Sequence, residues 1–495
     1  MNEGPTTEKP AKKARRAPGG LRRRHVLIGA TAAAGGLALT RVLGLHNLGE
    51  LPGQTPTTVD WISPLDRPEA QVAHLLRRAT FGTTPAEYQQ SVKDGFSKTV
   101  DRLIETPAVE PPALPGGDDA SRDKPIRPAE LQTWWVDWML KAPTPFAERM
   151  TFFWHGHFTS DFRKVNGQFP FMYWQNLTWR KMAVGSLGDI LYQVTIDPAM
   201  LRYLDLAQST GRNPNENYSR ELMELFTMGV GTFSEEDVRS AARALSGWRE
   251  PITQAIYDAQ VKQAMEQGRQ VPRNLKPDDA RTGVFEQQRS YVGGVKFLGD
   301  VRQWDTKSVL AKILTQDSVA PFIVTKVLRE FVSDQTADAQ VKRLADGFRK
   351  SRYDVKTLMR DVFTSPEFIQ PTSYRALVKS PIELMVNMAK ALEAPALARS
   401  IATAGDGMGQ SLFDPPEVGG WPSNASWISS NNVLARVNFV QATLTGMAKI
   451  PPFKDAHMTQ LDGVVSPATA QLLNSSPDDA TRWLILLASP EFQLK

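Results

Sequence analysis

The chain has 495 residues, 41% of them apolar and 22% charged, which is typical of a globular protein long enough to bury a sizeable core. It contains no cysteine, which excludes disulfides, iron–sulfur clusters and every metal site with thiolate ligands. The formal net charge is +5, but residues 1–50 hold nine basic and three acidic side chains, so the remainder carries 49 basic and 50 acidic ones. A body without a basic surplus argues against nucleic acid as a partner.

The N-terminal segment has the pattern of an export signal. Three arginines, Arg22 to Arg24, precede a short, glycine-diluted apolar run from Val26 to about Thr40, which is too short to span a membrane comfortably. Paired arginines before such a run resemble the twin-arginine signal. We therefore predict a leader over residues 1–44 and export by the twin-arginine route to the periplasm or the outside of the cell membrane. Arg41 interrupts the run and no clean cleavage site follows, so membrane contact is expected only through an uncleaved leader.

The mature chain is predicted to be mainly α, with one large multi-helix domain. Residues 45–67 are rich in Pro, Gly and Thr and form the expected linker, and helical periodicity dominates residues 68–495. A polar, Gln-rich stretch over about 250–283 is expected to be an insertion. The following stretch, about 284–298, contains Gly293-Gly294 and is the best candidate for a small β hairpin. Helices are predicted from Pro68 to near Gly82, from Pro85, and over 128–142, 145–155, 305–316, 318–332, 338–350, 354–363, 379–394, 430–447, 466–473 and 478–488.

Two closely spaced histidines lie in an aromatic segment. On a strand, His155 and His157 would face the same side, whereas on a helix they would point about 200° apart. Gly156 suggests that His155 ends a helix and that His157 lies beyond it, which leaves a shared metal ion open. The alternative is a pair of histidines satisfied by hydrogen bonds within an aromatic cluster. Trp154 and Asp161 flank the pair and are candidate binding residues.

A second candidate region is the helix expected to end at Gly229. At 100° per residue it has an apolar stripe and a polar face. The polar face is either a solvated surface with ion pairs or a buried carboxylate cluster around one arginine, fit for acid–base work or for a cation. Its members are Glu216, Asn217, Arg220, Glu221 and Glu224, of which Asn217 is a candidate binding residue.

Several segments together resemble a bacterial family known as domain of unknown function 1800. The stretches that carry the resemblance are 74–82 (HLLRRATFG), 154–158 (WHGHF), 197–201 (DPAML), 203–205 (YLD), 215–229 (NENYSRELMELFTMG), 242–248 (ARALSGW) and 419–422 (GGWP). The resemblance implies an exported, mostly helical bacterial protein, encoded beside another exported family, without an established activity. The family often carries His-Asp before the Gly-x-Lys of the hairpin. Here Tyr291-Val292 stand in its place, which speaks against an activity that needs that pair.

Two functions follow as hypotheses. The favoured one is non-catalytic binding of a polysaccharide or an exported partner protein, for which Trp248 and Trp421 are further candidate binding residues. The alternative is an envelope hydrolase, with or without a divalent metal as cofactor. Its candidate catalytic residues are His155, His157, Glu221, Glu224 and Arg220, the first four being also the candidate metal ligands.

Overall fold

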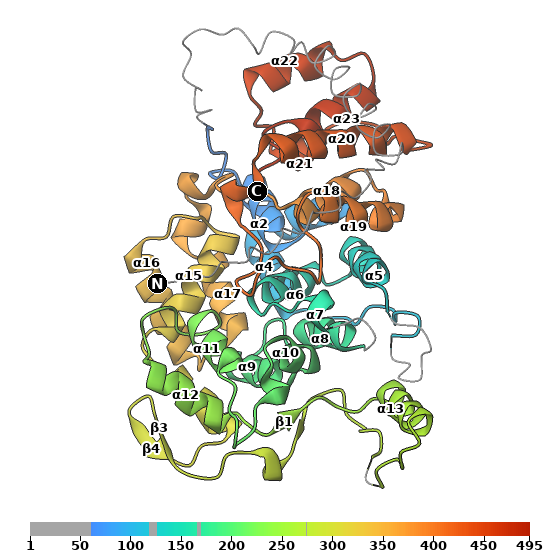
Figure 1. The fold of residues 1–495 in the computed structure, drawn as a ribbon. Helices are drawn as coiled ribbons and strands as arrows, with labels where there is room; N and C mark the ends of the chain where they lie inside the picture. Colours follow the sequence, from blue (N-terminus) through green and yellow to red (C-terminus); the bar gives the residue numbers. More distant parts are fainter. Residues whose placement is uncertain (1–60, 118–125, 166–169, 274) are drawn as a thin grey trace, which may run out of the picture. The chain divides into compact units, whose positions relative to one another are not determined.

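Residues 61–117, 126–165, 170–273 and 275–495 are described by a computed structural model. The predicted leader, 1–44, lies outside these residues, as does the predicted linker up to residue 60. The described part belongs to one compact unit, Thr58–Lys495, and is mainly helical, as the sequence predicts (Figure 1). None of its helices combines the length and the apolar character that crossing a membrane requires.

The first helices begin where the sequence supplies start signals. Proline stands at the first turn of α2, α3 and α5, where its missing N–H costs no hydrogen bond. Thr84 adds a capping box with Glu87 at the start of α3. The bounds are α2 Pro68–Ala79, α3 Pro85–Asp94, α4 Phe96–Glu105 and α5 Pro128–Lys141.

The central helices form the most buried part of the chain. Apart from the half-buried Pro145 and Gly156, every residue of α6 is buried, because aromatic side chains occupy both of its faces. The helix continues through His157, so the expectation that His155 ends it is wrong: Gly156 is accommodated inside the helix. The bounds are α6 Pro145–His157, α7 Phe162–Val165, α8 Phe171–Lys181, α9 Leu187–Ile196, α10 Pro198–Tyr203, α11 Asn217–Glu224 and α12 Glu235–Ala244.

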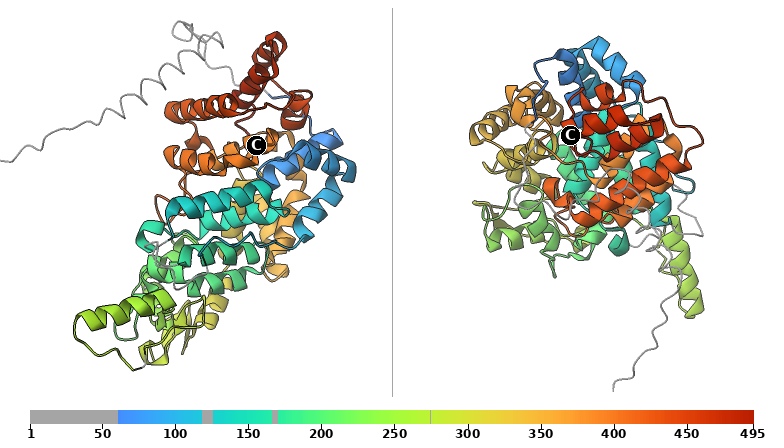
Figure 2. Two further views of the ribbon diagram at one scale, coloured as in Figure 1. Left: turned by 90° about the vertical axis from the view of Figure 1, so that its right-hand side faces the viewer. Right: turned by 90° about the horizontal axis from the view of Figure 1, so that it is seen from above.

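A small β hairpin is present, as predicted, but it spans Val295–Arg302 and not 284–298. Strand β2 (Val284–Phe285) pairs antiparallel with β1 (Trp248–Arg249), and β3 (Val295–Phe297) pairs with β4 (Asp300–Arg302). The tight turn lies at Leu298-Gly299, where both residues have positive φ, rather than at Gly293-Gly294. The 250–283 stretch lies between β1 and β2 and contains α13 (Gln254–Glu266), which has no buried residue and projects from its neighbours (Figure 2).

Most of the later helices follow the predicted ranges closely, whereas the helices over 398–407 and 456–461 are not among the predicted ones. Their bounds are α14 Thr306–Leu314, α15 Val319–Phe331, α16 Asp338–Lys350, α17 Val355–Phe363, α18 Pro381–Ala391, α19 Ala398–Gly407, α20 Ser430–Gly446, α21 Ala456–Leu461, α22 Pro467–Ser475 and α23 Asp479–Ala488. Short 3₁₀ helices are η2 Leu206–Gln208, η3 Gln287–Arg289, η4 Pro366–Ile369, η5 Pro371–Ser373, η6 Pro395–Leu397 and η7 Asn424–Trp427.

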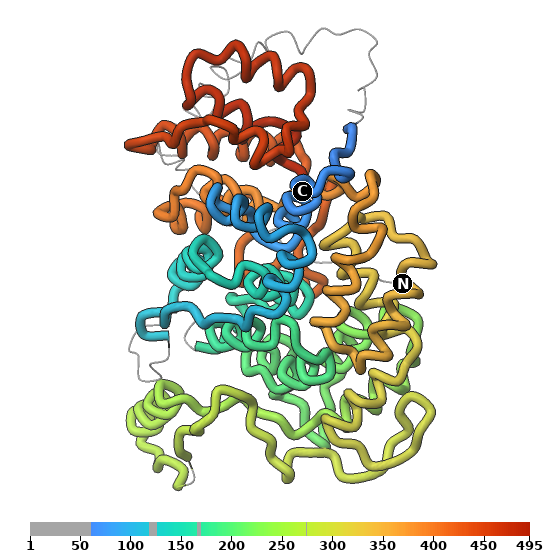
Figure 3. Tube along the Cα trace, turned by 180° about the vertical axis from the view of Figure 1, so that it is seen from behind, coloured from blue at the N-terminus to red at the C-terminus, as the bar shows by residue number. Residues whose placement is uncertain are grey.

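Segments far apart in the sequence pack together around one hydrophobic core. Helix α4 packs against α17, and α5 packs against α19 (Figure 3). The buried ring of His74 in α2 forms a hydrogen bond of 3.0 Å with the carbonyl of Phe368. The last residues also return to the body, where Val378 and Leu494 form an antiparallel bridge. This return brings Lys495 beside α15 and α18.

Candidate functional site

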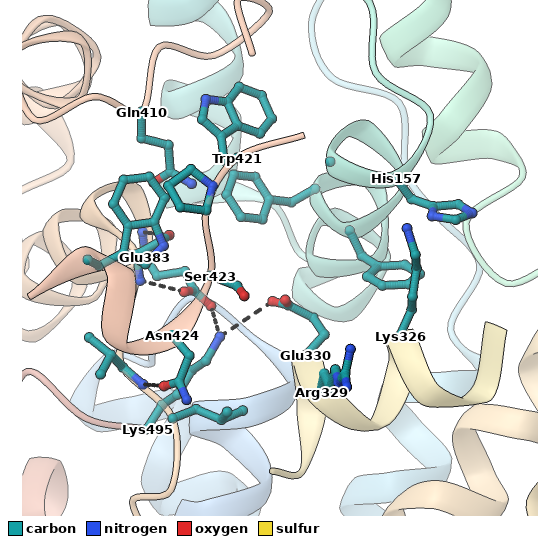
Figure 4. A pocket seen from close by; sticks show the side chains of 18 residues that line it. His157, Lys326, Arg329, Glu330, Glu383, Gln410, Trp421, Ser423, Asn424 and Lys495 are labelled. Atoms are coloured by element: carbon teal, nitrogen blue, oxygen red, sulfur yellow. Dashed lines mark hydrogen bonds and ion pairs between the residues drawn. The ribbon is translucent and has the colours of Figure 1, made fainter. Parts of the chain in front are cut away.

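A pocket with a cavity volume of about 260 Å³ lies between α6, α15 and the loop that carries Trp421 (Figure 4). We call it the Trp421 pocket. Four aromatic side chains line it, together with polar and charged groups. The aromatic residues are Phe152, Phe153, Trp421 and Trp427, the charged ones are Lys326, Arg329, Glu330, Glu383 and Lys495, and the other polar side chains are His157, Ser380, Gln410, Ser423 and Asn424.

A contact between two glycines sets the wall of the pocket. Gly420 has φ +98°, and a Cβ placed on it would lie 2.4 Å from the carbonyl oxygen of Gly156. Only glycine at position 420 therefore lets the loop approach α6 this closely. The hydroxyl of Thr159 donates a hydrogen bond of 2.6 Å to the carbonyl of Val418 and ties the same loop to the end of α6. These contacts place Trp421 against the pocket.

A buried network of charges forms the floor of the pocket. Glu383 forms an ion pair of 2.7 Å with the fully buried Arg149, and it also pairs with Lys495. Burial raises the pKa of the Glu383 carboxyl, but Lys495 and Arg149 outweigh this effect and hold it well below its ordinary value. Glu330 pairs with the same two cations. Both carboxylates are thus neutralised within the protein (Figure 4).

Two other cations of the pocket have no carboxylate partner among the described residues. Lys326 and Arg329 lie one turn apart on α15. The Lys326 ammonium donates a hydrogen bond of 3.3 Å to the carbonyl of Leu225 and lies 5.0 Å from the centroid of the Phe322 ring. Burial, helped by the charge of Arg329, lowers the pKa of Lys326 to about 8. Arg329 is exposed and forms no ion pair within the described part of the chain.

His157 presents an unused nitrogen at the pocket. Its Nε2 lies 3.0 Å from the carbonyl oxygen of Phe226, and since a carbonyl only accepts, Nε2 carries the hydrogen. Burial, and then the charge of Lys326, lowers the pKa of His157 well below its ordinary value, so the ring is neutral. Its Nδ1 is therefore an acceptor, and it is buried without a hydrogen-bond partner. In Figure 4 the Lys326 ammonium lies next to this ring.

His155 lies on another face of α6. Its Nε2 accepts a hydrogen bond of 3.0 Å from the backbone N–H of Phe413, and its ring packs against Trp135 and Trp421 at centroid distances of 5.0 and 5.2 Å. Burial lowers its pKa to about 3. The two histidines thus have separate partners, as their 200° separation on a helix requires.

The other predicted aromatic residues fall in different places. Trp154 is buried and donates a hydrogen bond of 2.8 Å to the carbonyl of Ala183, as a core residue does. Trp248 is buried as well and donates to the hydroxyl of Thr306 at 2.9 Å. Trp421 is only half-buried and lines the pocket, and its indole N–H has no hydrogen-bond partner. Of the three, Trp421 alone lines this pocket.

The polar face of α11 is half-buried and paired locally. Arg220 forms two hydrogen bonds of 2.7 Å with Glu235 on α12 and a weaker contact of 3.5 Å with Glu216. Burial, and then the charge of Glu224, raises the pKa of Glu221. Within the described residues neither Glu221 nor Glu224 forms a hydrogen bond or ion pair with a histidine ring, and neither residue lines the Trp421 pocket.

The remaining predicted polar residues lie outside the pocket as well. Asn217 donates a hydrogen bond of 3.4 Å to the carboxylate of Asp205. Asp161 accepts one of 2.6 Å from the backbone N–H of Arg163, whose guanidinium also pairs with Asp414 at 2.7 Å. Among the described residues there is no group of three or more His, Asp or Glu side chains that could hold a metal ion. His155, His157, Glu221 and Glu224 are not brought together into one.

Tyr291, which stands where the resemblance implies histidine, lines a second pocket. Its backbone N–H donates a hydrogen bond of 2.9 Å to the hydroxyl of Ser246, and the pocket is shared with Trp248 and Trp304. The adjacent Val292 is 73% exposed. A tyrosine that lines a pocket and an exposed valine thus stand where the resemblance implies a His-Asp pair.

Two of the residues predicted from the sequence, His157 and Trp421, line the Trp421 pocket, whereas its charged residues were not predicted. Arg149, Lys326, Arg329, Glu330 and Glu383 lie on three helices whose periodicity marks them only as polar positions among apolar ones. Proline before Glu383 and the capping box at Ser380 predict a helix start and nothing more. No local signal could have shown that these side chains meet.

The fold and the pocket define a mainly helical protein with a cavity that has aromatic and charged walls. At this cavity lies an imidazole nitrogen without a hydrogen-bond partner among the described residues. The chain belongs to the DUF1800 family, described as proteins of unknown function, whose sequence pattern matches residues 74–494. No curated protein and no solved structure matches the chain.

Proposed function

We propose that this protein is an exported cell-envelope protein that binds a polysaccharide in the Trp421 pocket without chemically altering it. The observation that carries the proposal is a half-buried tryptophan in the wall of a cavity that is also lined by charged and amide side chains. The apolar face of a sugar ring packs on aromatic side chains, while its hydroxyl groups exchange hydrogen bonds with polar ones. The twin-arginine pattern of the leader supports export.

The rigidity of the pocket also favours binding. Glu330 and Glu383 are held in place by Arg149 and Lys495, and the Trp421 loop is held by Gly156 and Thr159. Groups that are already fixed lose little conformational entropy when a ligand arrives. A small concave site of this kind suits a repeating sugar unit better than the flat surface of a partner protein.

The hydrolase alternative has weaker support. Glu383 is held ionised, so it lacks a proton to donate near neutral pH. The rings of His155 and His157 and the carboxylates of Glu221 and Glu224 have separate sets of contacts. An acid and a base flanking one scissile bond are therefore not assembled by these four residues.

Replacement of Trp421 by alanine tests the proposal. We expect the affinity for polysaccharides prepared from the cell envelope of the source bacterium to fall about tenfold or more, because the stacking surface is lost. Binding is measured by titration calorimetry. Trp134→Ala is the matched control, since Trp134 is also half-buried but lies on α5 outside the pocket. Equal affinities of both variants and the parent protein would contradict the proposal, provided that thermal melts show both variants folded.

A further inference from the structure

Only some of the charged side chains that line the Trp421 pocket have a counter-charge among the described residues. Its lining side chains carry three formal positive charges and two negative ones, and the buried Arg149 beneath it adds another positive charge. Glu330 and Glu383 are shared between Arg149 and Lys495. Lys326 and Arg329 thus remain, on the opposite part of the pocket, without a counter-charge among the described residues (Figure 4).

Two unpaired cations one turn apart repel each other, and the repulsion is strongest where water is scarce. The Lys326 ammonium lies 5.0 Å from the centroid of the Phe322 ring, and among the described residues its one hydrogen-bond partner is the Leu225 carbonyl. An anion placed between the two side chains would relieve the repulsion and recover part of the desolvation cost. Arg329 offers in addition the planar fork of donors that matches a carboxylate or a sulfate.

Two uncharged groups at the same pocket also lack hydrogen-bond partners within the part of the chain that the structure describes. The Nδ1 of His157 is a buried acceptor beside Lys326, and the Nε1–H of Trp421 is a buried donor. Buried polar atoms without partners are uncommon in folded proteins, because removing such an atom from water without a new hydrogen bond is unfavourable. A ligand with a hydroxyl group next to its anionic group can satisfy the imidazole nitrogen and occupy the two cations at once.

We infer that the Trp421 pocket binds an anionic polysaccharide, with a carboxylate or sulfate group of a sugar between Lys326 and Arg329 and a neighbouring hydroxyl donating to Nδ1 of His157. This inference rests on the proposed function and adds the chemical class of the ligand. It assigns charge recognition to α15 and ring stacking to the Trp421 loop.

Titration calorimetry of the full chain with four probes tests the inference. The probes are oligosaccharides of a polyuronate, the same oligosaccharides with their carboxyl groups reduced to alcohols, a sulfated polysaccharide, and poly-glutamate. We expect one of the two anionic carbohydrates to bind at least about tenfold more tightly than the reduced one at low salt, and added salt to remove most of the difference.

Variants that remove single charges test whether Lys326 and Arg329 provide the preference for the anionic carbohydrate. Lys326→Met and Arg329→Met are each expected to lower the affinity for the anionic carbohydrate about tenfold, and Lys326→Arg is expected to retain binding. Arg399→Met is the matched control, because Arg399 is also an exposed helical arginine without an ion pair in the described part of the chain. Thermal melts of each variant show whether it is folded.

Three outcomes would overturn the inference. If the reduced oligosaccharide binds as tightly as its charged parent and still requires Trp421, the charge assignment fails while the proposed function stands. If poly-glutamate binds as tightly as the anionic carbohydrates, the sugar specificity fails. If no carbohydrate binds the folded protein, both the inference and the proposed function fail.

Discussion

Glu383 and Arg149 are ionised side chains removed from water, and their counter-charges come from each other, from Lys495 and from Glu330. Removing such charges from water is unfavourable, and the attraction between them offsets this desolvation free energy only while every partner is present. Arg149 also lies 5.1 Å from the centroid of the Phe331 ring, whose face attracts a cation. At the scale of single residues, the pocket is therefore a place where one substitution has a large effect.

Replacement of Glu383 by glutamine is expected to lower the free energy of unfolding by about 3–5 kcal/mol, because Arg149 and Lys495 lose a shared counter-charge. The pKa of Glu383 is lower in the folded protein than in the unfolded chain. Its contribution is therefore complete above pH 4.5, its ordinary pKa, and is lost as the pH falls further. Chemical denaturation at several pH values measures both effects.

Glu105→Gln serves as the control for this prediction. Glu105 also pairs with two cations, Lys356 and Arg360, but on the surface, where water screens the charges. We expect its replacement to change stability little. A similar loss of stability in both variants would show that burial is not the cause.

At the scale of secondary structure elements, the contact between α6 and the Trp421 loop decides whether the pocket exists. Gly156 is an internal residue of α6 and exposes its carbonyl to the loop, and Gly420 approaches it with a backbone conformation that other residues rarely adopt. A helix normally disfavours an internal glycine by about 1 kcal/mol relative to alanine. An added Cβ at Gly156 would lie 4.0 Å from Trp421, an ordinary contact, so the glycine at position 420 is the one that allows the close approach.

Replacement of Gly420 by alanine is expected to destabilise the protein by about 2–4 kcal/mol and to abolish polysaccharide binding. The new Cβ would lie 2.4 Å from the Gly156 oxygen, so the loop and Trp421 must move. Gly231→Ala is the matched control, since Gly231 also has a positive φ, +79°, but nothing lies within 4 Å of its added Cβ. It is expected to cost about 1 kcal/mol and to leave binding intact. Unfolding curves measure the change in stability, and tryptophan fluorescence measures the change in polysaccharide binding.

At the scale of the whole molecule, the core does not depend on every segment. In α13 no side chain is buried, and Ile256 is its one partly buried apolar residue that packs against the core. The two ends of the surrounding stretch are joined by hydrogen bonds of 2.7 and 2.8 Å between Ile252 and Asp278. Asp278 is itself held by Arg249 at 2.6 Å. The insertion is thus closed at its base.

Replacement of residues 254–276 by a short Gly-Ser linker is expected to change the free energy of unfolding by no more than about 1 kcal/mol, because loop length affects stability only weakly and little apolar surface is lost. Binding at the Trp421 pocket should remain unchanged. Asp278→Ala, which opens the base of the insertion, should destabilise the protein more than the deletion does. A deleted protein that no longer folds would contradict this prediction.

Local patterns in the sequence were enough to predict the helical class, many of the helix ranges and the family, although helices such as α8, α19 and α21 were not predicted. Proline at first turns, capping residues and apolar periodicity are local signals, and they act through contacts between residues three or four positions apart. The sequence patterns failed for the strand pairing, because Leu298 adopts a left-handed conformation without a composition signal. They also failed for the end of α6, because the internal Gly156 does not terminate the helix.

Only the tertiary structure decided which residues form a site. His155 and His157 are neighbours in sequence but face different surroundings, whereas His157, Lys326 and Trp421 are far apart in sequence and line one pocket. The physical reason is that a helix fixes the direction of each side chain locally, while the packing of helices separated by a hundred or more residues determines what each side chain meets.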